Sequence, residues 1–199
     1  MSMKLVVIKY NAGNVRSVQF ALERLGVESL LTDDPVQILS ADRIIFPGVG
    51  EASSAMAYLK ERGLDKVILE AKQPFLGICL GMQLMCAHSE ENDTSCLGVF
   101  QENVKRFVSD ASTQKIPQIG WNTIHDLKSP LFNAVPENSH CYFVHSYYAQ
   151  LGQHTIATTD YCGPFSAALH TRNYYGVQFH PEKSATLGAT IIENFLNII

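Results

Sequence analysis

The chain has 199 residues, of which 46% are hydrophobic and 17% charged, and a net charge of -4. A length near the roughly 100–200 residues of one domain predicts a single domain, residues 1–199, with enough chain for one core. The composition excludes a disordered chain, and no apolar run approaches the roughly 20 residues of a membrane-spanning helix. Because Lys and Arg do not cluster, neither a nucleic acid nor a membrane is an expected partner.

The cysteines indicate a reducing compartment. Their number is odd and their spacing irregular, in a chain too large to depend on disulfides: Cys79, Cys86, Cys96, Cys141 and Cys162. The first residues begin a strand-like segment and lack the pattern of a secretory signal, so we expect a cytoplasmic protein. No His or Cys pair has the spacing of metal ligands, and we expect neither a metal nor a cofactor.

The first half of the chain alternates predicted strands and helices. The strands are Lys4–Tyr10, Glu28–Leu31, Arg43–Phe46 and Pro74–Ile78. Residues 11–14 break the first strand, and Gly26 ends the helix that follows it. The helical segments are Val15–Leu25, Pro35–Leu39, Ala52 to Leu59 or beyond, Leu64–Ala71 and Leu80–Ala87. This alternation predicts a parallel sheet covered by helices on both faces.

After about residue 95 the pattern changes to short strands joined by turns. They are Val104–Val108, Gln118–His125, Cys141–Gln150, His154–Asp160, Phe165–Thr171 and Tyr174–Phe179. Such a series predicts an antiparallel or mixed sheet. A final helix is predicted over Ala185–Ile199, with Ser184 as its N-cap. The expected fold is α/β, with a central mixed, largely parallel sheet flanked by helices and a strand-rich C-terminal half.

A candidate nucleophile lies between a buried strand and a helix. Cys79 follows Gly77 and precedes Gly81 by two residues each, which is the G-x-nucleophile-x-G pattern of a nucleophile elbow. The glycines leave room for a sharp strand-to-helix turn, and the start of the helix favours a thiolate. Taken alone, Cys79 has a less favoured alternative, a small buried hydrophobic residue.

A thiolate nucleophile needs an imidazole base, and the base needs an orienting group. His180 and Glu182 stand on either side of a proline that holds the chain extended, so the carboxylate can turn back to the imidazole. Acyl transfer also needs hydrogen-bond donors for an oxyanion. The sequence offers the backbone N–H of Leu80 and the loop Pro47-Gly48-Val49-Gly50, which ends a strand at the same edge of the sheet.

Three motifs in this chain order resemble the triad-type (class I) glutamine amidotransferases, a family with a flavodoxin-like fold. They are Gly77-Ile78-Cys79-Leu80-Gly81-Met82-Gln83, Pro47-Gly48-Val49-Gly50 and His180-Pro181-Glu182. Further segments are similar to one branch, the glutaminase subunits of imidazole glycerol phosphate synthase in histidine biosynthesis. These are Asn14-Val15-Arg16-Ser17, Ile119-Gly120-Trp121-Asn122, Tyr142-Phe143-Val144-His145-Ser146-Tyr147 and the Lys183-Ser184 pair after Glu182.

The resemblance implies a role for each matching residue. Cys79 would attack the carboxamide of glutamine, His180 would transfer protons, and Glu182 would orient His180. The oxyanion would be held at Gly48, Val49 and Leu80. Glutamine would be bound by Gly50, Gln83, Glu91, His145, Ser146 and Tyr147. Ammonia would pass to a (β/α)8-barrel cyclase subunit, which activates the glutaminase allosterically in a heterodimer. That interface would involve Trp121, Asn122, Tyr142 and Lys183.

Other hypotheses remain open. The same chemistry serves glutaminase subunits of pyridoxal phosphate, anthranilate or aminodeoxychorismate synthesis. A non-catalytic regulatory module on the same fold, or a cysteine peptidase on a similar sheet, would be a different class of protein. The sequence also departs from the family at Lys9-Tyr10-Asn11, where Asp-Tyr-Gly is usual. A second departure is Gln101-Glu102-Asn103, where a glycine usually precedes the strand.

Overall fold

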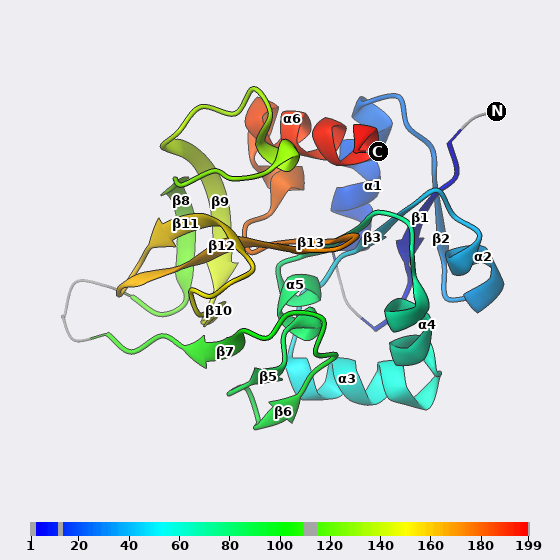
Figure 1. Cartoon of the computed structure of the whole chain (residues 1–199), viewed down its shortest axis with the longest axis horizontal. Coiled ribbons are helices and arrows are strands. Elements are labelled where there is room, and N and C mark those ends of the chain that lie inside the picture. Colours follow the sequence, from blue (N-terminus) through cyan, green and yellow to red (C-terminus); the bar gives the residue numbers. More distant parts are fainter. Residues whose placement is uncertain (1–2, 12–13, 110–114, 199) are drawn as a thin grey trace.

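The computed structural model describes residues 3–11, 14–109 and 115–198. Its largest sheet has the strand order β11-β12-β13-β4-β3-β1-β2 (Figure 1). These strands are β1 (Leu5–Ile8), β2 (Ser29–Thr32), β3 (Arg43–Phe46), β4 (Phe75–Ile78), β11 (Thr155–Asp160), β12 (Pro164–Thr171) and β13 (Tyr174–Val177). From β13 to β2 neighbouring strands are parallel, and β11 and β12 extend the sheet in antiparallel fashion. The predicted mixed, largely parallel sheet is confirmed.

Helices cover both faces of this sheet, as the unbroken apolar strands require. On one face lie α1 (Val15–Arg24) and α6 (Ala185–Asn197), and on the other α3 (Ala52–Glu61), α4 (Leu64–Glu70) and α5 (Leu80–Met85) (Figure 1). Successive residues of β1 alternate between the two cores: Val7 packs with α1 and α6, and Val6 packs with α3 and α4. The short α2 (Pro35–Leu39) joins the second core through Ile38.

The second half builds two smaller sheets beside the large one. One contains β10 (Tyr147–Ala149), β7 (Asn103–Arg106), β5 (His88–Ser89) and β6 (Thr94–Ser95), in that order. The other is an antiparallel pair, β8 (Gln118–Ile124) and β9 (Ser139–His145). Single-turn helices η1 (Pro130–Phe132) and η2 (Pro181–Lys183) complete the described elements. The predicted strand Cys141–Gln150 is therefore two strands in different sheets, which separate at Ser146.

Element ends differ from the predictions by a few residues. The strand predicted to reach Phe179 ends at Val177, because β4, its neighbour, ends at Ile78 and offers no further partner. Ser184 occupies the N-cap position of α6, but its side chain does not cap the helix. Its Oγ instead donates to the His180 carbonyl at 2.7 Å and accepts from the Tyr142 N–H at 3.0 Å. Ala12 and Gly13 of the predicted break, and Ile199 of the predicted last helix, lie outside the described residues.

The second departure from the family pattern has a structural role of its own. Glu102 is buried, and its carboxylate binds both the backbone N–H and the ring Nδ1 of His154, at 3.0 and 2.8 Å. His154 precedes β11, so this contact joins the start of β7 to the edge of the large sheet. Neither residue lines the cavity at Cys79. Glu102 thus helps to hold two sheets together, away from the candidate site.

Candidate active site

Cys79 forms the turn between β4 and α5. Its backbone is at φ 53° and ψ -111°, a strained conformation for a residue with a side chain. Two close approaches require the predicted glycines. A Cβ on Gly77 would lie 2.9 Å from the Gly81 carbonyl, and one on Gly81 would collide with the Phe46 carbonyl of β3. The nucleophile elbow predicted from the glycine spacing is therefore present, and β3 and β13 hold it from both sides.

His180 and Glu182 meet as the sequence predicts. The His180 Nδ1 lies 2.8 Å from Glu182 Oε1, and both side chains are buried. Asn14, at the start of α1, donates from Nδ2 to the same carboxylate oxygen at 2.6 Å. The other oxygen, Oε2, is buried and has no hydrogen-bond partner among the described residues. The carboxylate is thus directed at the imidazole by two contacts.

The charge state of His180 suits a base paired with a thiolate. Burial by itself lowers the pKa of His180, because it disfavours the imidazolium. The hydrogen bond and charge of Cys79, together with those of Glu182, outweigh burial and raise the pKa above its ordinary value. His180 is therefore held as a proton donor between a sulfur atom and a carboxylate.

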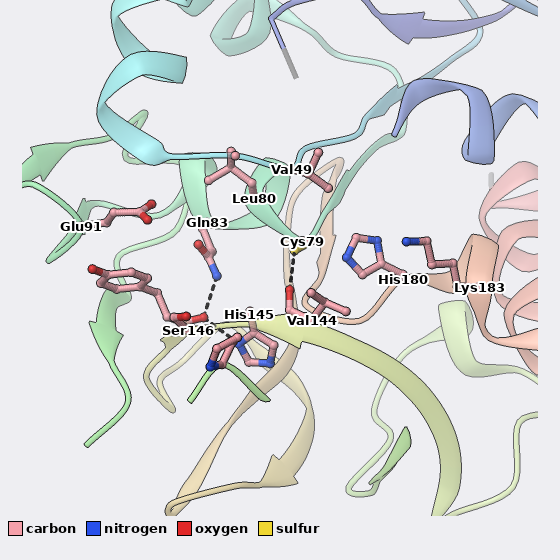
Figure 2. Close-up of a pocket in the computed structure, with 13 residues that line it drawn as sticks. Val49, Cys79, Leu80, Gln83, Glu91, Val144, His145, Ser146, His180 and Lys183 are labelled. Carbon is pink, nitrogen blue, oxygen red and sulfur yellow. Dashed lines mark hydrogen bonds between the residues drawn. The ribbon is translucent and has the colours of Figure 1, made fainter. Parts of the chain in front are cut away.

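Cys79 opens into a cavity of about 320 Å³ (Figure 2), within the usual size range for small-molecule sites. Its described lining is Val49, Gly50, Cys79, Leu80, Gln83, Glu91, Pro117, Val144, His145, Ser146, Tyr147, His180 and Lys183. This set includes every residue predicted to bind glutamine. Figure 2 shows Glu91 at one end of the cavity and Lys183 at the other, with Cys79 between them.

Two side-chain amides connect the cavity wall to the nucleophile. Gln83 Nε2 donates to the Tyr147 carbonyl at 2.7 Å and to Gln178 Oε1 at 2.9 Å. Gln178 Nε2 in turn donates to Cys79 Sγ at 3.7 Å. The Val144 carbonyl lies 3.8 Å from the same sulfur. Backbone and side-chain groups thus surround the thiol on several sides.

His145 lies beneath the cavity as a neutral ring. Burial, the largest effect, lowers its pKa to about 4, although a hydrogen bond to the Tyr147 carbonyl acts in the opposite direction. Since that carbonyl can only accept, the Nδ1 of His145 carries the proton at this 2.7 Å contact. His145 therefore fixes the backbone of Tyr147, the same carbonyl that Gln83 binds.

The predicted oxyanion donor is already occupied. The Leu80 N–H donates to the Gly48 carbonyl at 3.3 Å, so the loop after β3 covers the position where a substrate oxygen would be stabilised. Gly48 is packed closely against α5, since a Cβ there would lie 2.6 Å from the Gly81 nitrogen. Val49 lines the cavity and Gly48 does not.

The predicted interface residues are only partly together. Trp121 is 54% exposed and packs edge-on against Tyr142, with ring centroids 6.0 Å apart, and the Lys183 ammonium lies 6.0 Å from the Tyr142 ring centre. The side chain of Asn122 instead binds within the chain, donating to the Asp160 carbonyl at 2.9 Å. An exposed Trp with such neighbours is unlike a core residue.

Comparison with known proteins agrees with this geometry. A model of the family described as "Glutamine amidotransferase class-I" matches residues 6–199. The chain is 56% identical over 196 residues to the imidazole glycerol phosphate synthase subunit HisH of Bacteroides fragilis strain YCH46, covering 98% of this chain and all of that protein. The chain belongs to the class-I glutamine amidotransferases. This confirms the predicted family, enzyme class and branch, that of histidine biosynthesis.

Further relatives of this amidotransferase span equal lengths. The HisH subunit of Vibrio parahaemolyticus is 44% identical over 202 residues, covering 98% of both chains. A solved glutamine amidotransferase superposes with a TM-score of 0.72 at 18% identity, covering 96% of both chains. Another, from Thermotoga maritima, gives 0.64 at 18% identity, covering 99% of this chain and 84% of that one. The predicted fold class is confirmed.

Several groups of the amidotransferase site were not found from the sequence. Asn14 was recognised only as part of a family-like segment, although it contacts Glu182 directly. Gln178 was not singled out, yet it stands two positions before His180, and residues two apart in extended chain face the same side. That spacing was a usable signal.

No described group of His, Cys, Asp and Glu can hold a metal, and no described helix is long and apolar enough to cross a bilayer.

Proposed function

We propose that this chain hydrolyses glutamine to glutamate and ammonia through Cys79, His180 and Glu182, and passes the ammonia to a synthase partner. The observation that carries the proposal is the His180 to Glu182 contact of 2.8 Å beside a strained Cys79 that faces a cavity. We also infer that residues 1–199 act as one amidotransferase domain.

The reaction follows from the positions of these groups. The Cys79 thiolate attacks the carboxamide carbon, forming a carbon–sulfur bond, and the carbon–nitrogen bond then breaks while His180 gives its proton to the leaving ammonia. Water next attacks the thioester as His180 takes a proton from it. Glutamate leaves, and the thiolate and imidazolium are restored. Glu182 keeps the ring oriented and favours its protonated form during both steps.

Binding of glutamine would use the length of the cavity. Glu91 lies at the end of the cavity away from His180, and its carboxylate would bind the α-ammonium of glutamine. The Ala52 N–H donates to the same carboxylate at 2.8 Å and holds it in place. Gly50, Ser146 and Tyr147 line the cavity wall between Glu91 and His180. Placed in this direction, glutamine brings its carboxamide to Cys79. The product ammonia would leave at the end marked by His180 and Lys183.

We further propose that the partner is a (β/α)8-barrel cyclase subunit, bound as a heterodimer at Trp121, Tyr142 and Lys183. The backbone supports a link from this surface to the site, because the His180 N–H donates to the Tyr142 carbonyl at 2.9 Å. A partner that moves Tyr142 acts on His180 through this contact. Because the described cysteines form no disulfide, the cytoplasm is the proposed compartment.

The decisive experiment is ammonia release from glutamine by the purified chain, alone and with a barrel cyclase loaded with its ribotide substrate. We expect strong activation by the loaded partner. Hydrolysis at the same rate with and without the partner would support the proposed chemistry and contradict the proposed activation by the cyclase. No hydrolysis under either condition would favour a non-catalytic module.

A further inference from the structure

Gln178 occupies a position that the reaction described above does not use. It follows β13, its side chain is fully buried, and its backbone N–H donates to the Ala167 carbonyl at 2.8 Å. Its side-chain amide lies between Gln83, which lines the glutamine cavity, and Cys79. A buried amide with two such neighbours is fixed in place by its own hydrogen bonds.

The Tyr147 carbonyl oxygen determines which atoms donate and which accept in this series of hydrogen bonds. The Tyr147 carbonyl can only accept, so the group that Gln83 turns towards it, at 2.7 Å, is the NH₂. The same NH₂ lies 2.9 Å from Gln178, which must therefore present its carbonyl oxygen there. As a result the NH₂ of Gln178 faces the Cys79 sulfur. The amide of Gln178 cannot be turned over without breaking this series.

Besides the start of α5, two other groups near the sulfur affect its charge. The Val144 carbonyl, 3.8 Å away, is an acceptor and favours the thiol. His180 favours the thiolate, but it gives up its proton during the reaction. Gln178 has no proton to lose near neutral pH, so its N–H donates to the sulfur in every step. A hydrogen bond to the charged form favours that form.

We propose that Gln178 is a further catalytic residue: its side-chain NH₂ donates to Cys79, favours and aims the thiolate, and joins the nucleophile through Gln83 to the glutamine cavity. The donation to Cys79 stands on geometry alone, and its use in turnover rests on the proposed glutaminase function. In the second half of the reaction the same N–H stabilises the sulfur as it leaves the thioester.

The test is alkylation of Cys79 by iodoacetamide as a function of pH, followed by mass spectrometry of the peptide that carries Cys79. Gln178→Met keeps the volume and removes the donor. We expect alkylation of Cys79 near neutral pH to slow about tenfold, because the thiolate is the reacting form. With the loaded cyclase, kcat should fall about 10- to 100-fold with a smaller change in KM.

Asn173→Leu is the matched control, since it removes two amide hydrogen bonds at the opposite end of β13. It should lower Tm and leave the alkylation profile unchanged. If Gln178→Met does not fold, Gln178→Asn replaces it, because an amide shorter by one methylene cannot span from Gln83 to Cys79.

A Gln178 variant with a lowered Tm and a wild-type alkylation profile would overturn the proposal and leave only a structural role. Wild-type protein that releases no ammonia with the loaded cyclase would refute the proposed function instead. Because alkylation does not require glutamine, the two failures are distinguishable.

Discussion

The two sides of Cys79 differ in how ready they are for catalysis. On the side-chain side, His180, Glu182 and Asn14 are joined by contacts of 2.8 and 2.6 Å. On the backbone side, the Leu80 N–H is bound to the Gly48 carbonyl at 3.3 Å. Buried side chains with several partners are held in one geometry, whereas a backbone donor is available only when its present partner leaves. The proposed proton-transfer groups are thus prearranged, whereas the Leu80 N–H, the proposed oxyanion donor, becomes available only when the loop after β3 moves.

The largest effect is expected at Cys79 itself, which the side-chain and backbone groups both surround. Cys79→Ala removes the nucleophile and should lower ammonia release with a loaded cyclase by at least about 1,000-fold. Cys86→Ala is a suitable control, since Cys86 is also buried and lies at the other end of α5. The Cys86→Ala variant should be somewhat less stable than wild type and should hydrolyse glutamine at the wild-type rate. Substantial hydrolysis by Cys79→Ala would contradict the assignment.

The backbone side can be disturbed at Gly81. Gly81→Ala places a Cβ against the Phe46 carbonyl, and neither backbone can yield easily, so we expect a loss of about 2–3 kcal/mol in the free energy of unfolding. Urea denaturation measures it. Gly63→Ala, with φ 67° and open space around the added carbon, should cost only about 1 kcal/mol. Equal losses would mean that the close contact at Gly81 carries no special cost.

On the side-chain side, burial of neutral His145 predicts a stability that falls with acid. Its pKa is lowered to about 4 by burial, so between about pH 6.5 and 4 the unfolded chain binds more protons than the folded one, and acid favours unfolding. From pH 7 to 5 this amounts to about 2 kcal/mol. Denaturation of wild type and His145→Asn at both pH values isolates this contribution. An equal acid loss in the two proteins would refute it.

The smallest effect is expected at Asn14, whose side chain donates a hydrogen bond to the Glu182 carboxylate. Asn14→Asp keeps the shape and tolerates the positive φ of 72°, but places a second carboxylate against Glu182. We expect kcat for glutamine to fall about 5- to 10-fold with little change in KM, because like charges disfavour an ionised Glu182. Asn194→Asp, on α6, is the control and should leave kcat unchanged. A wild-type kcat for Asn14→Asp would mean that Glu182 needs no support.

Much of the fold could be predicted because its signals are local. The unbroken apolar strands β1, β3 and β4 indicate a sheet covered on both faces, and the glycines around Cys79 indicate the sharp turn. The order of strands could not be predicted from local patterns. That β13 pairs with β4, far from it in the chain, is decided by long-range packing.

The site was predictable where chemistry restricts the residue type. A nucleophile, a base and an orienting acid can be recognised by spacing, and the cavity contains each residue predicted to bind glutamine. Asn14 and Gln178 were missed because Asn and Gln side chains occur in many places in proteins. Only the folded structure shows that these two amides contact Glu182 and Cys79. The contact of Leu80 with Gly48 was missed because any sequence presents the same backbone atoms.

The position of β4 between β3 and β13 has a consequence for the synthesis of this protein. The nucleophile is translated well before the strand that leads to its base, and the strained turn at Cys79 has its second neighbouring strand only after residue 177. A nascent chain on the ribosome, or a fragment truncated before β13, therefore lacks both His180 and one side of the sheet that supports Cys79. The topology of the sheet therefore prevents a partly synthesised copy from bringing the nucleophile and its base together.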